Sequence, residues 1–518
     1  MVLIYGTIAY LRSKHRKTLE HLPPDPFRRP GWALFVARIR RPAPAASQRM
    51  RKSPGLEQLI IGGMSNRTET QPFPLERIFR SWWPLAASWM LMGAELPALS
   101  AVVARLSNPE INLAAYGGVV FPLALIIESP IIMLLAASTA LSKDWASYLK
   151  LRRFMMVAGG ALTALHILVA FTPLYYLFVV RVIGAPAEIV EPARVGLMIM
   201  TPWTWSIAYR RFHQGVLIRF DRSKAVGTGT AVRLATDLLV LLFGYWKGYP
   251  GIVVATSAVA AGVVMEALYV GIVVRPVLRG PLRAAPAVEQ PITMRSFLDF
   301  YIPLAMTSLL TLLVQPIGSA ALSRMPQALP SLAVWPVVSG LIFMLRSLGI
   351  AFNEVVVALL DEPRSARNLF RFSLLLAAAT TGLQLAIVAT PLAGVWFGLL
   401  SGLTPALAAL AVAGTWIALP MPGLSVFQSW FQGAMLHDRR TRGISEAVAV
   451  FLVSCSALLL AGVVWGRATG LYVGLGAFVL ASLAQTAWLW LRSQPALRLV
   501  QERDQSLEAL SSSSAPAD

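Results

Sequence analysis

Glutamate residues inside long apolar stretches are the first feature of this sequence that could do chemistry. Glu95 lies in the run WPLAASWMLMGAELPALSAVVA, two residues before Pro97. Hydrocarbon makes a charge costly, so an ionisable residue within a membrane span usually faces a partner, a cavity or a substrate. A proline removes a backbone hydrogen bond and bends the helix axis. We predict that Glu95 and Pro97 bind a coupling proton or sodium ion or contact substrate; the alternative is a protonated glutamic acid hydrogen-bonded inside the bundle.

Glu128 and Arg346 stand in the middle of two other apolar runs, at similar predicted depth in opposite halves of the chain. If both side chains face a central cleft, they could form a gate ion pair or bind a charged substrate. The alternative is that each pairs within its own half. The sequence leaves these two interpretations equally open.

Two polar pairs in the second half are further candidates for coupling or substrate contact. In the first run of the second half, Gln315 and Pro316 again place a polar residue beside a proline, as Glu95 and Pro97 do in the first run of the chain. Asn353 and Glu354 lie in the cytoplasmic half of a predicted span, where an inward-facing cavity could hydrate them.

Arg233 and Asp237 are four residues apart in one predicted helix. Residues at this spacing lie on the same helix face, so we predict that the two side chains pair with each other. We interpret this pair, and the single Glu266 in the next run, as structural.

Motifs typical of soluble enzymes are missing from the sequence. It contains no Walker A, GxSxG, HExxH or CxxC pattern, and one cysteine, Cys455, cannot form an intramolecular disulfide. The predicted extracytoplasmic loops are short, whereas membrane transferases need a sizeable soluble domain. We therefore expect neither an enzyme nor a cofactor. Without an ATP site, transport must use an ion gradient, an exchanged substrate or the solute's own gradient.

The composition indicates a protein embedded in a lipid bilayer. Hydrophobic residues make up 56% of the chain, charged residues 14%, and the mean hydropathy is +0.63. A soluble protein carries about 25% charged residues. The net charge of +20 is concentrated at the N-terminus, where residues 1–77 hold 14 Lys/Arg and five Asp/Glu. We interpret it as anchoring charge on the cytoplasmic side and expect no nucleic-acid partner.

Twelve apolar runs are long enough to span a bilayer, which takes about 20 helical residues. They lie at 80–104, 112–141, 152–177, 190–212, 225–246, 250–274, 297–323, 328–360, 366–391, 405–434, 442–465 and 470–491. The predicted fold class is an all-α polytopic membrane protein.

The last six runs repeat the first six in the same direction. The numbering offset is 219 for the matches of Pro84 with Pro303, Pro97 with Pro316 and Arg105 with Arg324. The offset is 218 from Arg153 onward and returns to 219 near Gly251. An offset of 219 matches Glu128 to Ser347, one position after Arg346. Two parallel six-helix lobes related by an axis along the membrane normal are a transporter architecture.

The predicted segments are a basic, disordered N-terminal arm (1–77), an N-lobe (78–278), a cytoplasmic linker (279–296), a C-lobe (297–495) and a polar tail (496–518). The positive-inside rule places basic loops such as 143–153 and 439–442 in the cytoplasm, together with both termini. The expected location is the cell inner membrane. We expect the arm to be dispensable, with Met64 as an alternative start.

Four stretches resemble the multidrug/oligosaccharidyl-lipid/polysaccharide (MOP) exporter superfamily and, within it, the progressive ankylosis protein family: 81–106, 153–178, 202–226 and 419–443. The resemblance covers about residues 78–495. It implies two MATE-like lobes in a V, with spans 1, 2, 7 and 8 lining a central cleft and rocking to give alternating access. It also implies export of small anions such as pyrophosphate, ATP and citrate. Glu95 stands where the family also looks acidic.

Three positions, in two spans, depart from the family's pattern. The Arg-Pro of the seventh span is Gln315-Pro316 here, and the Glu and Arg of the eighth span are Ser347 and Gly349. A site with fewer fixed cations should bind polyanions less well. We predict a secondary active exporter that is coupled to H⁺ or Na⁺. Its predicted small-molecule substrate is an organic or phosphate-containing anion. The alternatives are a lipid-linked precursor or cationic drug exporter and, from another class, a non-transporting membrane scaffold.

Overall fold

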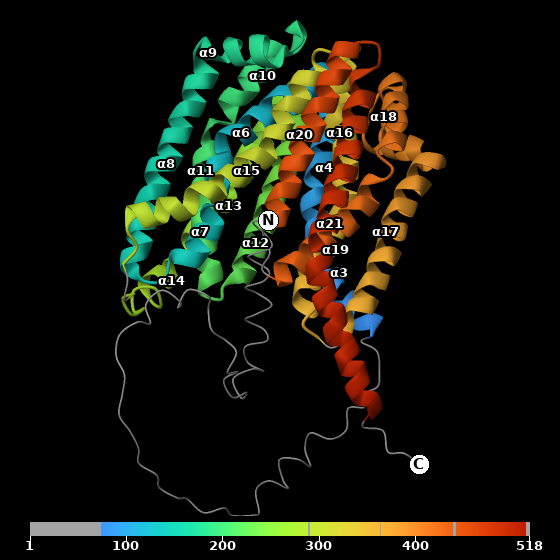
Figure 1. Ribbon diagram of the computed structural model, residues 1–518. Coiled ribbons are helices and arrows are strands. Elements are labelled where there is room, and N and C mark those ends of the chain that lie inside the picture. The colour runs from blue at the N-terminus through green and yellow to red at the C-terminus, as the bar shows by residue number, and fades with distance from the viewer. Residues whose placement is uncertain (1–73, 289–290, 363, 439–441, 514–518) are drawn as a thin grey trace, which may run out of the picture.

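Two lobes of helices stand side by side in this computed structural model (Figure 1). It describes residues 74–288, 291–362, 364–438 and 442–513, and these contain no strand. The expected basic arm, apart from residues 74–77, and most of the loop 439–442 lie outside the described residues. Large apolar side chains such as Trp246 and Val464 are 74% and 81% exposed. Such side chains on the outside of the bundle suit a surface that faces lipid.

We assign the first six spans to the N-lobe, and several of them are interrupted. The first consists of α3 (Leu75–Gly93) and α4 (Glu95–Val103), and the second of α5 (Pro109–Ala115), the π-helical η1 (Tyr116–Val120), α6 (Phe121–Ile132) and α7 (Leu134–Leu141). The remaining elements are α8 (Trp145–Phe171), α9 (Leu174–Tyr176), the π-helical η2 (Leu177–Ile183), α10 (Ala187–Ile199), α11 (Thr201–Arg219), α12 (Ser223–Lys247), α13 (Gly251–Val273) and α14 (Arg275–Arg279).

The C-lobe follows the same order with longer, less interrupted helices. Its elements are α15 (Met294–Leu322), α16 (Ala328–Leu359), α17 (Ser365–Ala389), the π-helical η3 (Gly394–Leu400), α18 (Pro405–Ile417), α19 (Met421–His437), α20 (Arg442–Trp465) and α21 (Gly470–Ser513). We call the end of the bundle at which α7, α11, α16 and α19 finish the basic end, and the opposite end the far end.

Eleven of the twelve expected spans are long and apolar enough to cross a membrane, counted over the described residues. The exception is the fourth, expected at 190–212, which is formed by α10 and α11 in succession. The second half of α11 carries four polar residues, Arg210, Arg211, His213 and Gln214. These residues make the fourth span too polar to count among the apolar membrane-crossing helices. Three of these four side chains are buried within the bundle.

Matching hydrogen bonds confirm the parallel repeat. The Asn112 side chain accepts a hydrogen bond from the backbone N–H of Ile252 at 3.0 Å. In the C-lobe, Ser331 accepts the corresponding bond from Leu471 at 3.0 Å. Donor and acceptor are both displaced by the repeat offset of 219, so the two lobes fix their sixth span to their second span in the same way.

The offset changes from 219 to 218 within the second span. Ser129 donates to the carbonyl of Ile126, and Ser347 donates to that of Met344, an offset of 218. Between this point and Asn112 lies η1, and a π-helical turn contains one extra residue. The expected match of Glu128 to Ser347 is therefore wrong: past the π-turn, Glu128 corresponds to Arg346.

Gly117, near the start of η1, touches Pro336, which is its counterpart at the offset of 219 that holds before the extra residue. A Cβ atom built on Gly117 would stand 2.7 Å from Cγ of this proline. Two residues that correspond in the repeat can touch only near the axis that relates the lobes. Only a glycine leaves room for the proline ring at this place.

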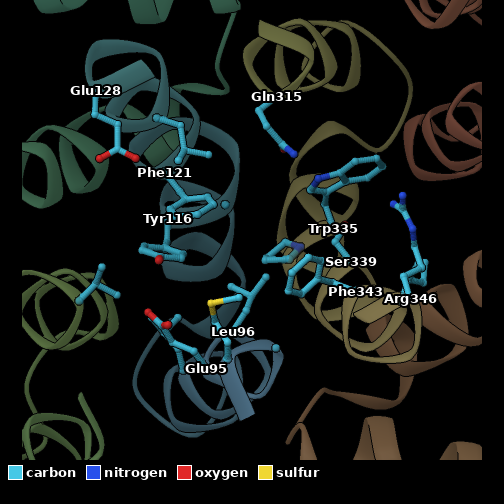
Figure 2. Close-up of a pocket in the computed structure, with 18 of the residues that line it drawn as sticks. Glu95, Leu96, Tyr116, Phe121, Glu128, Gln315, Trp335, Ser339, Phe343 and Arg346 are labelled. Atoms are coloured by element: carbon cyan, nitrogen blue, oxygen red, sulfur yellow. The ribbon is translucent and has the colours of Figure 1, made fainter. Parts of the chain in front are cut away.

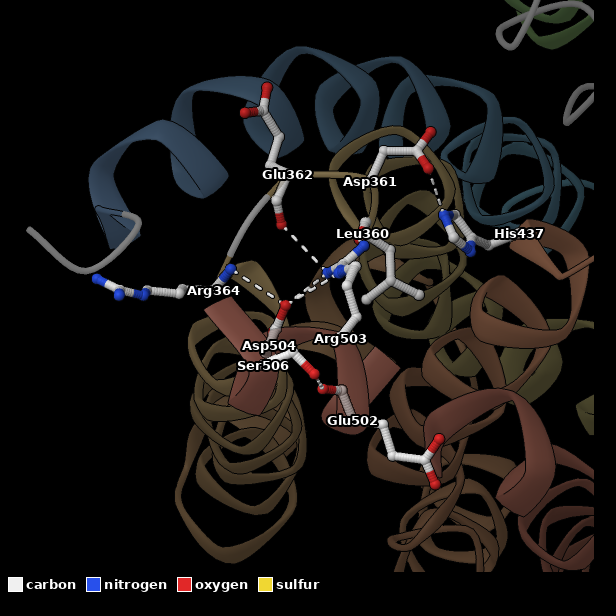
Figure 3. Close-up of polar contacts among 9 residues, drawn as sticks. All are labelled: Leu360, Asp361, Glu362, Arg364, His437, Glu502, Arg503, Asp504 and Ser506. Carbon is white, nitrogen blue, oxygen red and sulfur yellow. Dashed lines mark hydrogen bonds and ion pairs between the residues drawn. The ribbon is translucent and has the colours of Figure 1, made fainter. Parts of the chain in front are cut away.

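The tail expected after residue 495 continues α21 as a helix to Ser513. Arg503 donates to the carbonyl of Leu360 at 2.9 Å, and Asp504 accepts from the N–H of Arg364 at 3.3 Å (Figure 3). Helix formers run through the segment, and these contacts tie it to the loop after α16. The same loop bonds to α3 through Glu362, whose carboxylate lies 2.6 Å from Arg77.

Candidate functional site

A cavity of about 430 Å³ lies between the lobes. It is lined from the N-lobe by α3, α4, η1, α6, α11, α12 and α13, and from the C-lobe by α15, α16, α19 and α21. In Figure 2, Glu95, Tyr116 and Glu128 lie on one side, and Trp335 and Arg346 lie on the other. Four of the predicted coupling or substrate candidates line this cavity, namely Glu95, Glu128, Gln315 and Arg346, and so does Arg233 of the predicted structural pair.

Glu95 begins α4 directly after a break in the first span. Pro97 has no N–H for the carbonyl of Gly93, and the helix is interrupted at Ala94 between α3 and α4. A carboxylate in the first turn of a helix is favoured by the helix dipole. The glutamate is thus held at a helix N-terminus beside the cavity. Pro97 itself packs on the eighth span, where a Cβ atom on Gly340 would be 3.1 Å from its ring.

The partner of Arg233 is Glu95, with 2.7 Å between guanidinium and carboxylate. The predicted pairing of Arg233 with Asp237 is wrong, because α12 directs Asp237 towards Gly262 of α13. Both oxygens of the Asp237 carboxylate are buried and have no hydrogen-bond partner. Spacing along one helix could not show that a neighbouring helix offers Arg233 a second carboxylate.

Glu266 links this ion pair to α11. Its carboxylate accepts hydrogen bonds from Arg210 and from Gln214, the latter at 2.8 Å, and lies 3.8 Å from Nε of Arg233. Glu266 is fully buried. The result is a continuous ionic network through four N-lobe helices, α4, α12, α13 and α11. Sequence reasoning treated Glu266 as structural and missed Arg210; the polarity of the fourth span was the available signal.

The C-lobe has none of these charges. The residues that correspond to Glu95, Arg210, Arg233, Asp237 and Glu266 are Val314, Gln428, Phe451, Cys455 and Gln485. Gln428 still makes a local bond, to the carbonyl of Ser482 at 3.3 Å. Among the described residues, no group of three His, Cys, Asp or Glu side chains is arranged to hold a metal ion. The ionic network is therefore a property of the N-lobe alone.

Glu128 and Arg346 reach the cavity from opposite lobes, at corresponding positions of the repeat. No ion pair joins them within the described part of the chain, so the gate ion pair, one of the interpretations that the sequence left open, is not formed in this conformation, and neither residue forms an ion pair within its own half. Oε2 of Glu128 and Nε of Arg346 are buried without a hydrogen-bond partner. Nε of Arg211, which also lines the cavity, is in the same situation. The cavity thus holds charged groups whose hydrogen-bonding capacity is not used.

The remaining candidates lie away from the cavity. Pro316 is inside α15, which remains one continuous helix. Asn353 and Glu354 are buried in the basic-end half of α16, and Asn353 donates to the carbonyl of Ser429 at 3.1 Å. The expected hydration of this pair through the cavity is therefore not seen, because α16 turns it towards α19.

Comparisons of the structure with solved structures give several matches. One is an inward-facing conformation of a multidrug resistance MATE family transporter of the MOP superfamily, with a TM-score of 0.58 and 15% identity, covering 80% of this chain and 99% of that one. Another is the lipid II flippase MurJ in an inward closed conformation, with a TM-score of 0.55 and 12% identity, covering 82% and 94%. This chain has the MOP fold. No protein-family model and no curated protein matches the sequence.

A third match is a MOP superfamily transporter from Pyrococcus furiosus described as having a binding pocket of reverse polarity. Its TM-score is 0.53 at 17% identity, covering 82% of this chain and 99% of that one. The predicted MOP-type, MATE-like architecture is thereby confirmed. The resemblance to the progressive ankylosis family stays a prediction.

At the far end of this MOP fold, two equivalent arginines join the lobes. Arg105, just past α4, donates to the carbonyl of Leu399 in the C-lobe. Arg324, just past α15, donates to the carbonyls of Ile183 and Val182 in the N-lobe, both at 2.6 Å. The acceptors end the π-helical segments η3 and η2, so the two contacts are related by the repeat.

At the basic end, two equivalent aromatic residues do the same. The indole of Trp82 in α3 donates to the carbonyl of Leu348 in α16 at 2.9 Å. Its counterpart in the repeat is Tyr301 of α15, whose hydroxyl donates to the carbonyl of Pro130 in α6. Hydrogen bonds between the lobes are therefore present at both ends of the cavity.

Proposed function

We propose that this protein is a secondary transporter that exports organic or phosphate-containing anions by alternating access. The observation that carries the proposal is a cavity between the lobes into which Arg211 and Arg346 bring guanidinium groups that lack an ion-pair partner among the described residues. A buried cation without a partner is unfavourable, and an anion entering the cavity would remove that cost. Hydrogen bonds between the lobes at either end could open in turn while the cavity holds the anion.

The N-lobe network is the proposed site of ion coupling. Glu95 lies beside the cavity, is 20% exposed, and forms an ion pair with Arg233. A proton or sodium ion on Glu95 would release Arg233 towards Glu266 or towards an anion in the cavity. Because the C-lobe carries no equivalent charges, we place coupling in one lobe and the solute between both.

The proposed setting is the inner membrane with the basic end in the cytoplasm. The concentration of Lys and Arg in the loops of that end supports this orientation. Export is the proposed direction, following the family resemblance, which also favours a progressive ankylosis-like anion exporter.

A cationic drug exporter is the second candidate, and one observation favours it. The Glu128 carboxylate reaches the cavity with one oxygen unpartnered, and a cation could take that place. A MATE neighbour of this fold is described as a multidrug resistance transporter. A scaffold without transport is disfavoured by the charged cavity, because a purely structural interface would gain by packing apolar side chains there.

The test is uptake into proteoliposomes under an imposed proton or sodium gradient, with anions and cations as solutes. Glu95→Gln should abolish the dependence on the gradient, and Arg346→Gln should slow anion uptake. The matched controls are Glu188→Gln and Arg367→Gln, at exposed positions outside the cavity lining. Normal gradient-driven uptake by Glu95→Gln would remove the coupling assignment. Uptake of cations alone would favour the second candidate.

A further inference from the structure

We infer that the substrate is an amphipathic monoanion, with an aromatic or other apolar body and a single anionic group. The inference rests on the proposed anion transport and concerns which anions fit. It follows from the unequal chemistry of the two cavity walls, from the count of unpaired cations, and from the size of the cavity.

The two walls of the cavity differ in polarity. The C-lobe wall is mainly aromatic and aliphatic, with the neutral polar side chains of Gln315 and Ser339 and one cation, Arg346; its largest apolar members are Trp335, Ile342, Phe343, Leu475 and Phe478. No acidic residue from the described part of the C-lobe lines the cavity. The N-lobe wall instead gathers the ionisable groups of α4, α6, α11 and α12. Figure 2 shows Phe343, Trp335 and Arg346 together on the side opposite Glu95 and Glu128.

Two of the three N-lobe arginines that line the cavity already form ion pairs. Arg233 is paired with Glu95, and Arg210 with Glu266. Arg211 has no ion pair within the described residues, but it shares its wall with the acidic Glu128. Arg346 is therefore the lining cation that has no acid on its own wall. A polyanion such as citrate or a diphosphate would need several such cations, whereas a monoanion needs one.

A buried N–H donor without an acceptor also favours an anionic substrate. The indole Nε1 of Trp203, a residue of the cavity lining, is buried and has no acceptor. Nε of Arg346 and of Arg211 also lack acceptors. Donors without acceptors outnumber the single unpartnered oxygen of Glu128, so an incoming acceptor is favoured over an incoming donor.

The volume of the cavity and its largely apolar C-lobe wall favour a substrate with an apolar body in addition to its anionic group. A cavity of about 430 Å³ falls within the ~300–1,000 Å³ typical of small-molecule sites. A single phosphate ion would leave most of it filled with water against aromatic rings, which is unfavourable. A bicyclic aromatic carboxylate places its rings on Trp335 and Phe343 and its carboxylate at Arg346. Apolar burial and charge pairing then act in one molecule.

The test compares four probes on the purified full-length chain. 1-Naphthoate is the fitting monoanion, 1-naphthylmethylammonium is a cation of the same shape, acetate lacks the apolar body, and citrate is the polyanion. Binding is measured by calorimetry, and transport by counterflow in proteoliposomes. We expect 1-naphthoate to bind at least tenfold more tightly than each of the other three and to be transported.

Variants connect the binding to the proposed wall. Arg346→Gln should weaken 1-naphthoate binding about 10- to 100-fold, as expected for loss of one charge-assisted hydrogen bond. Arg346→Lys keeps the charge and should recover most of that loss, which a misfolded variant could not do. Phe343→Ala should weaken 1-naphthoate and leave acetate unchanged. Arg367→Gln, on an exposed face of α17, should match the wild type.

Each contrary result has a distinct meaning. Citrate or phosphate bound and transported better than 1-naphthoate would overturn the monoanion inference and leave anion transport standing. Preference for 1-naphthylmethylammonium would overturn both in favour of a cation exporter. An unchanged affinity in Arg346→Gln would show that 1-naphthoate binds elsewhere, and the inference would fail.

Discussion

Trp82 and Tyr301 occupy the same position in the two lobes and make the same kind of bond to the opposite lobe. Trp82 donates to Leu348, and Tyr301 donates to Pro130. Each also packs edge-on against a phenylalanine at an offset of 218, Phe372 and Phe154. The basic end of the cavity is thus held by two copies of one contact, and each copy can be removed separately.

Tyr301→Phe should open the basic end more often. The change deletes the hydroxyl that bonds to Pro130 and keeps the ring packing on Phe154. A hydrogen bond contributes about 0.5–1.5 kcal/mol, so the open population should rise up to about tenfold. The measurement is maleimide labelling of Ser339→Cys in the cavity lining, in a Cys455→Ala background that has no other cysteine.

The matched control is Tyr245→Phe, which removes an exposed hydroxyl at the end of α12. Labelling from the basic side should rise for Tyr301→Phe alone. Equal labelling of both variants would mean that this bond does not hold the basic end closed.

The two arginines at the far end should differ in effect. Arg324 donates to two N-lobe carbonyls at 2.6 Å, whereas Arg105 reaches the single carbonyl of Leu399 in the C-lobe. Arg324→Gln should therefore raise labelling of the cavity from the far side more than Arg105→Gln does. With about 1.5–3 kcal/mol per charged hydrogen bond, the difference should exceed tenfold. A larger effect of Arg105→Gln would contradict this assignment.

The Glu95–Arg233 pair should show strong coupling in a double-mutant cycle. Arg233→Gln leaves the Glu95 carboxylate without its cation, and Glu95→Gln leaves Arg233 with Glu266 alone. We expect each single change to lower the free energy of unfolding by about 1–3 kcal/mol and the double change to cost less than the sum. Thermal unfolding in detergent measures the three variants. Additive losses would show that the two side chains do not interact.

Asp144, at the basic end between the second and third spans, gives a pH dependence. Burial raises its pKa, but hydrogen bonds from Ser147 and Val288 outweigh this, so the pKa lies below its usual value. A lowered folded-state pKa stabilises the protein above the unfolded pKa of about 3.9, and this contribution is lost as pH falls through the folded value.

The corresponding variant is Asp144→Ala, which removes the N-cap of α8. It should cost about 0.5–2 kcal/mol at neutral pH. The difference from the wild type should shrink as the pH falls below about 4. A difference in unfolding temperature that stays constant from pH 7 to the acid limit would argue against a charged cap.

The parts of the site that the sequence predicted are those with a strong local signal. A carboxylate or guanidinium in an apolar run stands out, so Glu95, Glu128 and Arg346 were found, and all three line the cavity. Pairing depends on how helices turn towards one another, which a single helix does not encode. For that reason the pairing of Arg233 with Glu95 was missed.

The register of the repeat was predictable only in part. The sequence revealed that the offset changes between Arg105 and Arg153, but the change could have lain anywhere in two spans. Only the backbone shows that the extra residue is in η1, which moves the counterpart of Glu128 from Ser347 to Arg346. The continuation of α21 was also hidden, because its contacts with Leu360 and Arg364 are tertiary.

The contact between Gly117 and Pro336 bears on how such a protein can arise. A chain of half this length, paired with a copy of itself about the same axis, would place one residue type against itself at this point. Two prolines would collide there, and two glycines would leave a gap. Fusion of the halves into one gene lets each position change alone, so a small residue can face a large one. The same freedom allows one lobe to keep its charges while the other loses them.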